Sequence, residues 1–278
     1  MRLEHSSGHR RDTGRVQTFT AFPHGATFHR VHHDAVERRC QGMAVKLGAT
    51  EYGAGEPVVI LHGLFGFGRN WATIAQRLGA HHRVIAFDLR NHGASPWTDT
   101  MDYAAMAEDV AAAMAERGYR HYALIGHSMG GKVAMAAALS EPDKVTRLVV
   151  VDIAPIAYPV PYLGYVRALR DLDLTAIVRR RDADAALAAA IPDAAERTFL
   201  LQNLVLGDGP PHWRLNLTVL EAALPQIADF PIFASGSAYR GPTLFIAGGR
   251  SRALRPEHET TVKALFPVAE IARIENAG

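Results

Sequence analysis

Short apolar runs alternate with amphipathic segments along most of the chain. The apolar runs cover residues 57–61, 83–87, 122–125, 147–151, 242–247 and 269–274. Continuous apolar runs of this length predict strands that are buried on both faces. Segments with a helical period lie between several of these runs, at about 70–80, 102–117 and 130–141. This alternation predicts a mostly parallel sheet with helices on both sides.

One long interval interrupts the alternation. Roughly 90 residues separate Asp152 from Pro242, and they are rich in Ala, Leu and Arg. Helix-like stretches occur there at about 163–170, 182–190 and 194–205. We expect a helical insertion at about 156–240 that lies as a lid over the carboxyl edge of the sheet, where such folds bind ligands.

Residues 1–42 differ from the rest of the chain, because they hold six histidines and seven arginines and show no strand or helix period. We expect them to form a disordered extension, and Met43 is a candidate start of the natural chain. Two alternatives stay open. His29, His32 and His33 could bind a metal, although no carboxylate or thiol lies at a fixed spacing, and the segment could be an organelle-targeting peptide, which its four acidic residues disfavour.

The composition is that of a soluble globular protein with a sizeable core, at 278 residues, 48% hydrophobic and 21% charged. A formal net charge of +2, with only four lysines among 30 basic residues, disfavours a nucleic-acid partner. The single cysteine, Cys40, cannot form an internal disulfide, so we expect a reducing, cytoplasmic location. No apolar run in the sequence reaches the length of a membrane span, and no segment resembles a secretory signal.

The sharpest motif is Gly126-His127-Ser128-Met129-Gly130-Gly131, which lies between an apolar run and a helical segment. A serine on such a tight strand-to-helix turn has a strained backbone, and the flanking glycines avoid the clashes that side chains would cause. The serine hydroxyl then projects from the edge of the sheet at the start of a helix. We therefore predict that Ser128 is a catalytic nucleophile and that His127, whose side chain points away from it, is structural.

The apolar run at 57–61 leads into a second motif, His62-Gly63-Leu64-Phe65-Gly66. Acyl transfer creates a tetrahedral oxyanion that preorganised N–H groups must stabilise. The backbone N–H groups of Leu64 and Met129 are the natural pair for this oxyanion hole. His62 could serve as a base, but beside a glycine turn we favour a role in ordering the loop through hydrogen bonds.

Together with further motifs, these two occur in the order found in α/β-hydrolase fold esterases, and the chain most closely resembles the bacterial YbfF-like acyl esterases and their mitochondrial relatives. The further motifs are Asp88-Leu89-Arg90-Asn91-His92-Gly93-Ala94-Ser95, Val151-Asp152-Ile153-Ala154-Pro155, Trp213-Arg214-Leu215-Asn216-Leu217, Gly248-Gly249-Arg250-Ser251 and Asn276-Ala277-Gly278. The resemblance covers residues 43–278. It implies an α/β-hydrolase fold with a mostly parallel central sheet, flanking helices and a helical lid insertion.

A serine hydrolase also needs an acid and a base, which follow the nucleophile in the order Ser, Asp/Glu, His. The loop at 248–255, which holds the acid in many members of the superfamily, contains no carboxylate. Asp152 lies 24 residues after Ser128 at the carboxyl end of the next buried strand, and the resemblance points to the same residue. We favour Asp152 as the acid, with Asp208 and Glu257 as substitutes and a turn-capping role for Asp152 as the alternative.

The base is harder to assign. In the family that the chain resembles, the catalytic histidine directly follows Asn-Ala-Gly, and this chain ends at Asn276-Ala277-Gly278. His212 and His258 lie in other contexts. We expect the chain to be a fragment or a truncated product that lacks the final helix, exposes apolar surface, dissolves poorly and is inactive as it stands.

The serine nucleophile favours hydrolysis of carboxylic esters or thioesters through an acyl-enzyme at Ser128, without a cofactor or metal. The apolar insertion suggests a short- to medium-chain acyl group, with Phe65 and Trp213 as candidate substrate contacts. Further candidate lining residues are Tyr158, Tyr162, Leu163 and Phe230. A peptidase, a haloperoxidase-like enzyme, a carbon–carbon bond hydrolase and a non-catalytic ligand-binding relative remain alternatives.

Overall fold

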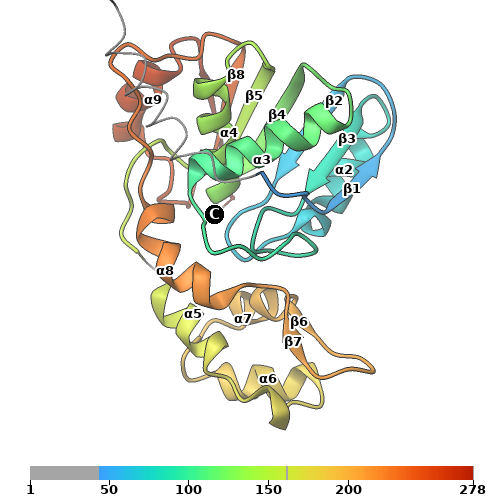
Figure 1. The fold of residues 1–278 in the computed structure, drawn as a ribbon. Coiled ribbons are helices and arrows are strands. Elements are labelled where there is room, and N and C mark those ends of the chain that lie inside the picture. Colours follow the sequence, from blue (N-terminus) through green and yellow to red (C-terminus); the bar gives the residue numbers. More distant parts are fainter. Residues whose placement is uncertain (1–43, 161, 278) are drawn as a thin grey trace, which may run out of the picture. The chain divides into compact units, whose positions relative to one another are not determined.

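The computed structural model describes residues 44–160 and 162–277. Within the chain, Gln41–Gly278 forms one compact unit, shown in Figure 1. The predictions for residues 1–42, including the possible histidine metal site and the targeting peptide, lie outside the described residues. No helix in the described part of the chain is long and apolar enough to cross a membrane.

The described residues form a central sheet of seven strands in the order β1-β3-β2-β4-β5-β8-β9. Its strands are β1 (Ala49–Tyr52), β2 (Pro57–Leu61), β3 (Arg83–Phe87), β4 (Tyr122–His127), β5 (Val145–Val151), β8 (Thr243–Gly248) and β9 (Glu270–Ile274). All neighbouring pairs are parallel except β1 and β3. The predicted mostly parallel sheet is confirmed. Strand β1 was not predicted, because it is short and half-exposed and so leaves no continuous apolar run in the sequence.

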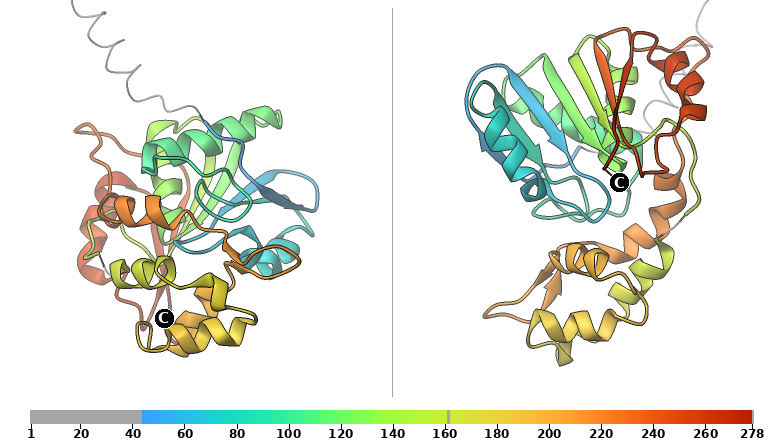
Figure 2. Two further views of the ribbon diagram at one scale, coloured as in Figure 1. Left: turned by 60° about the horizontal axis from the view of Figure 1, so that its bottom comes forward. Right: turned by 180° about the vertical axis from the view of Figure 1, so that it is seen from behind.

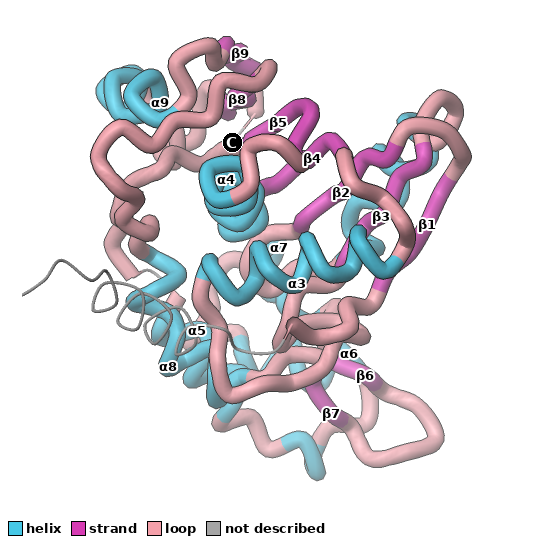
Figure 3. The backbone as a smooth tube through the Cα atoms, turned by 45° about the horizontal axis from the view of Figure 1, so that its top comes forward, coloured by secondary structure: helices cyan, strands magenta, loops and turns pink. Residues whose placement is uncertain are grey.

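The helices divide between the two faces of this sheet. One face packs against α3 (Tyr103–Glu116), α4 (Met129–Ser140) and α9 (Glu259–Leu265), which share the main hydrophobic core (Figure 3). The other face packs against α2 (Ala72–Leu78), with a smaller core that includes Ile60 and Val84. These four helices match the predicted pattern of helices on both sides, and α3 begins where the Asp102 carboxylate accepts a hydrogen bond from the Ala105 N–H.

Burial differs between the centre and the edge of the sheet. Every residue of β2 is buried, as a strand between two helical layers requires. The prediction that the run at 269–274 is buried on both faces is wrong, because β9 is an edge strand and four of its five residues are exposed. Its charged residues Glu270 and Arg273 suit an edge, where solvent reaches the strand.

The face of the sheet that carries α2 is only partly covered toward β9. Side chains of β4, β5 and β8 that point to this face are half-buried. They are Ile125, Val149, Val151, Leu244 and Ile246. This part of the sheet therefore presents partly covered apolar side chains, with the exposed Arg147 among them.

The insertion between β5 and β8 is mainly helical and lies beyond the carboxyl ends of the strands (Figure 2). It contains α5 (Leu163–Arg170), α6 (Arg180–Leu187), α7 (Ala194–Leu201), a short hairpin of β6 (Leu204–Val205) and β7 (His212–Trp213), and α8 (Leu217–Ala228). The three predicted helices are present: α5 has the predicted ends, α6 lies two to three residues earlier than predicted, and α7 begins as predicted but ends four residues earlier. The hairpin and α8 were not predicted, and Pro225 inside α8 is the kind of residue that conceals a helix from sequence inspection.

Candidate active site

Ser128 lies on the turn between β4 and α4 with φ 49° and ψ −119°, a strained conformation for a residue with a side chain. Its N–H donates to the Val151 carbonyl at 3.0 Å, which fixes the turn to the neighbouring strand. The neighbouring positions must be glycine, because a side chain there would clash with nearby backbone atoms. A Cβ at Gly126 would lie 2.2 Å from the Gly130 oxygen, and a Cβ at Gly130 would lie 2.4 Å from the His62 oxygen.

His62 orders the loop after β2. Its Nε2 accepts the Leu89 N–H at 2.9 Å, and its Nδ1 donates to the Gly63 carbonyl at 2.8 Å when Nδ1 carries the proton. Burial lowers the pKa of His62 to about 4, so the ring is neutral near pH 7. Because both ring nitrogens are occupied, the structure supports the loop-ordering role and leaves His62 no free nitrogen for a base.

The peptide groups on both sides of Phe65 are held in the same way. The Phe65 N–H donates to Nε2 of His92 at 3.3 Å, and the Phe65 carbonyl accepts Nδ2 of Asn203 at 2.8 Å. His92 is fully buried, and burial lowers its pKa to about 3. These contacts hold Phe65 at φ 64°, and one of them comes from the insertion. The shape of this loop therefore depends on both parts of the fold.

The two N–H groups predicted for an oxyanion hole are available. No hydrogen bond within residues 44–160 and 162–277 uses the backbone N–H of Leu64 or Met129. The first helical hydrogen bond of α4 runs from the Lys132 N–H to the Ser128 carbonyl, so the Met129 N–H belongs to the free first turn. Both residues line cavities that also contain Ser128.

Asp152 follows β5, the strand next to the one that leads to Ser128. It has φ 53°, its N–H donates to the Ile246 carbonyl, and its Oδ1 accepts the Gly248 N–H at 3.1 Å. The turn after β8 also reaches the end of β9, because the Arg250 N–H donates to the Ala277 carbonyl at 2.8 Å. The region just after β9 is therefore tied to the same turn that contacts the Asp152 carboxylate.

The two substitute acids lie elsewhere. Asp208 is exposed in the turn between β6 and β7, and Glu257 is exposed and pairs with Arg255 at 3.0 Å. Neither lines a cavity at Ser128. Asp152 is therefore the one of the three predicted carboxylates that the fold brings to the strand beside the nucleophile turn.

The remaining histidines that the sequence singled out have structural surroundings. His127 is half-buried, its ring lies 6.2 Å from that of Trp71, and burial lowers its pKa while Asp152 opposes that shift. His258 packs its ring edge-on at 6.3 Å from Tyr158. His212 is exposed in the insertion and contacts the Pro210 carbonyl.

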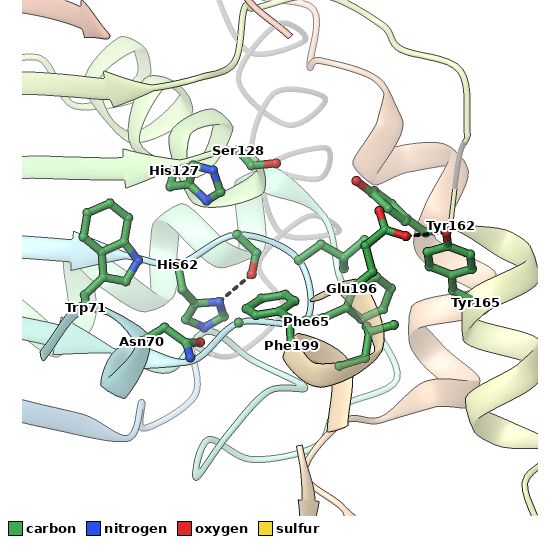
Figure 4. Close-up of a pocket in the computed structure, with 14 residues that line it drawn as sticks. His62, Phe65, Asn70, Trp71, His127, Ser128, Tyr162, Tyr165, Glu196 and Phe199 are labelled. Atoms are coloured by element: carbon green, nitrogen blue, oxygen red, sulfur yellow. Dashed lines mark hydrogen bonds between the residues drawn. The ribbon is translucent and has the colours of Figure 1, made fainter. Parts of the chain in front are cut away.

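Two cavities meet at the nucleophile, and Leu64, Ser128 and Tyr162 line both. The first, which we term the polar cavity, measures 220 Å³ and is shown in Figure 4. Its other lining residues include Phe65, Asn70, Trp71, His127, Tyr165, Glu196 and Phe199. The second, the apolar cavity, measures 170 Å³, and its lining residues include Met129, Lys132, Ile153, Tyr158, Leu224 and Ile227.

The predicted substrate contacts separate in the structure. Phe65 lines the polar cavity, whereas Trp213 is buried in the insertion and lines neither cavity. Among the further lining candidates, Tyr158 and Tyr162 reach the cavities. Leu163 and Phe230 belong to the hydrophobic core.

Lys132 is a buried lysine that sequence reasoning missed. Its side chain is 1% exposed, and its Nζ donates to the carbonyls of Ile156, Ala228 and Asp229 at 2.9, 2.9 and 2.6 Å. Burial lowers its pKa to about 8. These carbonyls lie at the start of the insertion and at the end of α8, its last helix, so one ammonium on α4 joins both segments to the helix that follows Ser128. The signal was present, because Lys132 is the one charged residue of α4 and lies among glycine, alanine and other apolar residues.

Glu196 and Asn203 were also missed, and their local sequence gave little signal. Both lie in the insertion, where α7 and the residues after it look like an ordinary amphipathic helix. Their importance comes from contacts with the distant loop at Phe65 and from the lining of the polar cavity. Among the described residues, no group of three or more histidine, cysteine, aspartate or glutamate side chains is arranged to hold a metal ion.

Comparison with known proteins places these features in a family. The model of the family described as alpha/beta hydrolase fold matches residues 56–278. The chain is 41% identical to the sn-1-specific diacylglycerol lipase ABHD11 of Mus musculus, over 80% of this chain and 74% of that protein. It is 34% identical to esterase YbfF of Escherichia coli (strain K12), over 80% of this chain and 85% of that protein. A solved structure, the marine microorganism esterase, matches with a TM-score of 0.81 at 33% identity, over 84% of this chain and 93% of that chain.

Proposed function

The chain belongs to the α/β-hydrolase fold family and is by homology a serine hydrolase of the esterase or lipase type, and from this premise we propose that Ser128 is its nucleophile. The observation that carries the proposal is the backbone of Ser128, which is strained at φ 49° in a turn that leads into α4. A fold has no structural need for such strain, whereas a nucleophile gains exposure and nearby N–H donors from it.

The proposed reaction proceeds through an acyl-enzyme. Oγ of Ser128 forms a bond to the ester carbonyl carbon while its proton passes to a histidine, and the resulting oxyanion accepts hydrogen bonds from the N–H groups of Leu64 and Met129. The bond to the leaving group then breaks, and the leaving group takes the proton from the histidine. Water, activated by the same histidine, releases the acid and restores Ser128.

Asp152 is proposed to orient that histidine. The resemblance puts the histidine directly after Asn276-Ala277-Gly278. The geometry supports this proposal, because the last residue of β8 contacts the Asp152 carboxylate through the Gly248 N–H and the turn that follows contacts the Ala277 carbonyl through the Arg250 N–H. We therefore propose that a side chain just after this region lies near the Asp152 carboxylate.

The apolar cavity is proposed to bind the acyl half of an ester or thioester. Its lining includes Leu224 and Ile227 of α8 and Met129 beside the nucleophile. At roughly 30 Å³ for each water-sized group, its 170 Å³ holds about five or six such groups. A short- to medium-chain acyl group fits this space.

The proposal is tested by hydrolysis of p-nitrophenyl butyrate and by labelling with a fluorophosphonate probe. Both measurements use the 278-residue chain and the same chain extended by a segment that begins with histidine directly after Gly278. We expect the extended chain to turn over the ester, and Ser128→Ala to lower kcat by about 10³-fold or more and to abolish labelling. Ser140→Ala, an exposed serine at the end of α4, is the matched control and should leave both unchanged.

Two results would overturn the proposal. Turnover that survives Ser128→Ala would assign the chemistry to another residue. Binding of the ester without turnover in both forms of the chain would favour the non-catalytic relative instead.

A further inference from the structure

The polar cavity contains one lining side chain that bears a formal charge among its described residues, Glu196 of α7. Its two histidines, His62 and His127, have pKa values lowered by burial and are neutral near pH 7. Figure 4 shows the Glu196 carboxylate and the Ser128 hydroxyl facing the same space. A substrate group that enters this cavity therefore meets a negative charge.

Glu196 is an exposed residue, and its contacts within the described residues include no cation. Its carboxylate accepts a hydrogen bond from the Tyr165 hydroxyl, which also lines the cavity. No ion pair among the described residues includes Glu196, and the next residue, Arg197, pairs with Asp184 at 2.8 Å. Glu196 lies at an exposed position in the first turn of α7. The carboxylate therefore keeps acceptor positions free for a ligand.

The two cavities differ in a way that matches the two halves of an ester. An acyl chain is apolar, and the apolar cavity is lined largely by aliphatic and aromatic side chains. The leaving group carries the polar groups of most natural esters and thioesters, and the polar cavity offers the Glu196 carboxylate, the Tyr165 hydroxyl and the Asn70 side chain. Carboxylates accept hydrogen bonds from hydroxyl groups and repel anions.

We propose, on the premise that Ser128 is the nucleophile, that the polar cavity binds the leaving-group half of the substrate and that Glu196 selects uncharged, hydroxyl-bearing alcohols over anionic leaving groups. Glu196 is a specificity residue in this proposal, because it acts on the leaving group and not on the reacting carbonyl. The favoured substrates are then esters of neutral polyols. Thioesters of phosphate-bearing thiols are disfavoured.

The test compares two hexanoate esters that differ in the charge of the leaving group, 4-carboxyphenyl hexanoate and 4-(hydroxymethyl)phenyl hexanoate. It uses the form of the chain that shows Ser128-dependent turnover. The measured quantity is the ratio of kcat/KM for the anionic ester to kcat/KM for the neutral ester. Each variant is compared with the wild type on the same pair of esters, so differences in leaving-group reactivity cancel.

We expect Glu196→Gln to raise this ratio about tenfold and Glu196→Lys to raise it further, because the variants remove and then reverse the repulsion. In the wild type, the preference for the neutral over the anionic ester in kcat/KM should become smaller in 1 M NaCl, where the Debye length is about 3 Å. Tyr165→Phe should keep the discrimination, because the carboxylate remains. Glu116→Gln, the same chemical change at an exposed position of α3, should leave the ratio unchanged.

The outcomes separate this inference from the proposed function. An unchanged ratio in Glu196→Gln, with turnover still dependent on Ser128, overturns the role of Glu196 and leaves the nucleophile in place. Loss of the Ser128 dependence overturns the proposed function itself. An anionic acyl probe, the p-nitrophenyl monoester of succinic acid, completes the test. If Glu196→Gln accelerates that probe and not the anionic leaving group, the polar cavity binds the acyl half and the assignment is wrong.

Discussion

The loop around Phe65 is held by side chains that lie outside the motif to which it belongs. His92 accepts the Phe65 N–H, and Asn203 of the insertion donates to the Phe65 carbonyl. Leu64, whose N–H is proposed to bind the oxyanion, directly precedes this residue. The position of that N–H therefore depends on residues from two distant parts of the chain.

Replacement of Asn203 is expected to affect the chemical step more than substrate binding. Asn203→Asp keeps the shape of the side chain but removes the donor to the Phe65 carbonyl. We therefore expect kcat to fall about tenfold, with little change in KM. This loss is smaller than the loss caused by removing an oxyanion donor itself. Steady-state kinetics on p-nitrophenyl butyrate provide the measurement. Thr198→Ala, an exposed position of α7, is the control, and an equal rise in KM would instead indicate a role in substrate binding.

His62 and His92 make folding sensitive to acid. Their folded pKa values, about 4 and about 3, lie below the ordinary 6.5, so below pH 6.5 the unfolded chain binds protons that the folded chain does not. Stability contributed by the neutral rings is complete above pH 6.5 and is lost as the pH falls toward 4, by about 1.4 kcal/mol per pH unit for each histidine.

The measurement is urea unfolding between pH 7.5 and pH 4.5. His92→Gln keeps one donor and one acceptor but cannot titrate, so the slope of unfolding free energy against pH should become shallower by about 1.4 kcal/mol per unit below pH 6.5. His121→Gln, an exposed histidine, should leave the slope as it is. A wild-type slope that persists in His92→Gln would contradict the assignment.

At the scale of elements, the insertion and the sheet are joined at α4. Lys132 donates to three carbonyls, one at the start of the insertion and two at the end of α8. Lys132→Met would leave these carbonyls without their donor, and we expect a loss of about 3 kcal/mol in the free energy of unfolding, measured with urea. Lys144→Met, a lysine that is 45% exposed and pairs with Glu141, should cost about 1 kcal/mol or less. Equal effects of the two substitutions would refute the joining role of Lys132.

Helix α8 is expected to set the acyl length. Leu224 is buried and lines the apolar cavity, so Leu224→Phe should shorten the space and lower the ratio of kcat/KM for octanoate over acetate about tenfold in a p-nitrophenyl ester series. Thr218→Phe introduces the same ring on the exposed face of α8 and should leave the ratio unchanged. A ratio that does not respond to Leu224→Phe would place the acyl chain elsewhere.

The sequence could predict the elements whose cause is local. Strands buried between helices leave continuous apolar runs, and a serine turn that tolerates only small neighbours leaves glycines at fixed positions. The contacts of Lys132, Glu196 and Asn203 join residues that are far apart in the chain, and no local period encodes them. Helix α8 was missed for a different reason. Pro225 weakens the helix locally, and tertiary packing retains it.

For the whole molecule, the compact unit Gln41–Gly278 is expected to fold without the residues before it. A chain that starts at Met43 should have the same free energy of unfolding in urea as the full chain, within about 0.5 kcal/mol. Circular dichroism during urea unfolding provides the comparison. A lower midpoint or insoluble product would show that residues 1–42 contribute to the fold.

The contacts of the Lys132 ammonium also suggest that the insertion can be exchanged for the insertion of a relative. Because one side chain holds the carbonyls of Ile156 and Ala228, the chain between them is a loop closed at its base, much as a cross-link would close it. A chimera in which a relative's insertion replaces the residues between these two carbonyls would keep the contacts of Lys132, which use only backbone oxygens. The new insertion would also have to supply an amide at the place of Asn203, which holds the Phe65 loop. The chimera should then show the leaving-group and acyl preferences of the relative that donated the insertion. Ser128, Leu64 and Asp152 would still come from this chain.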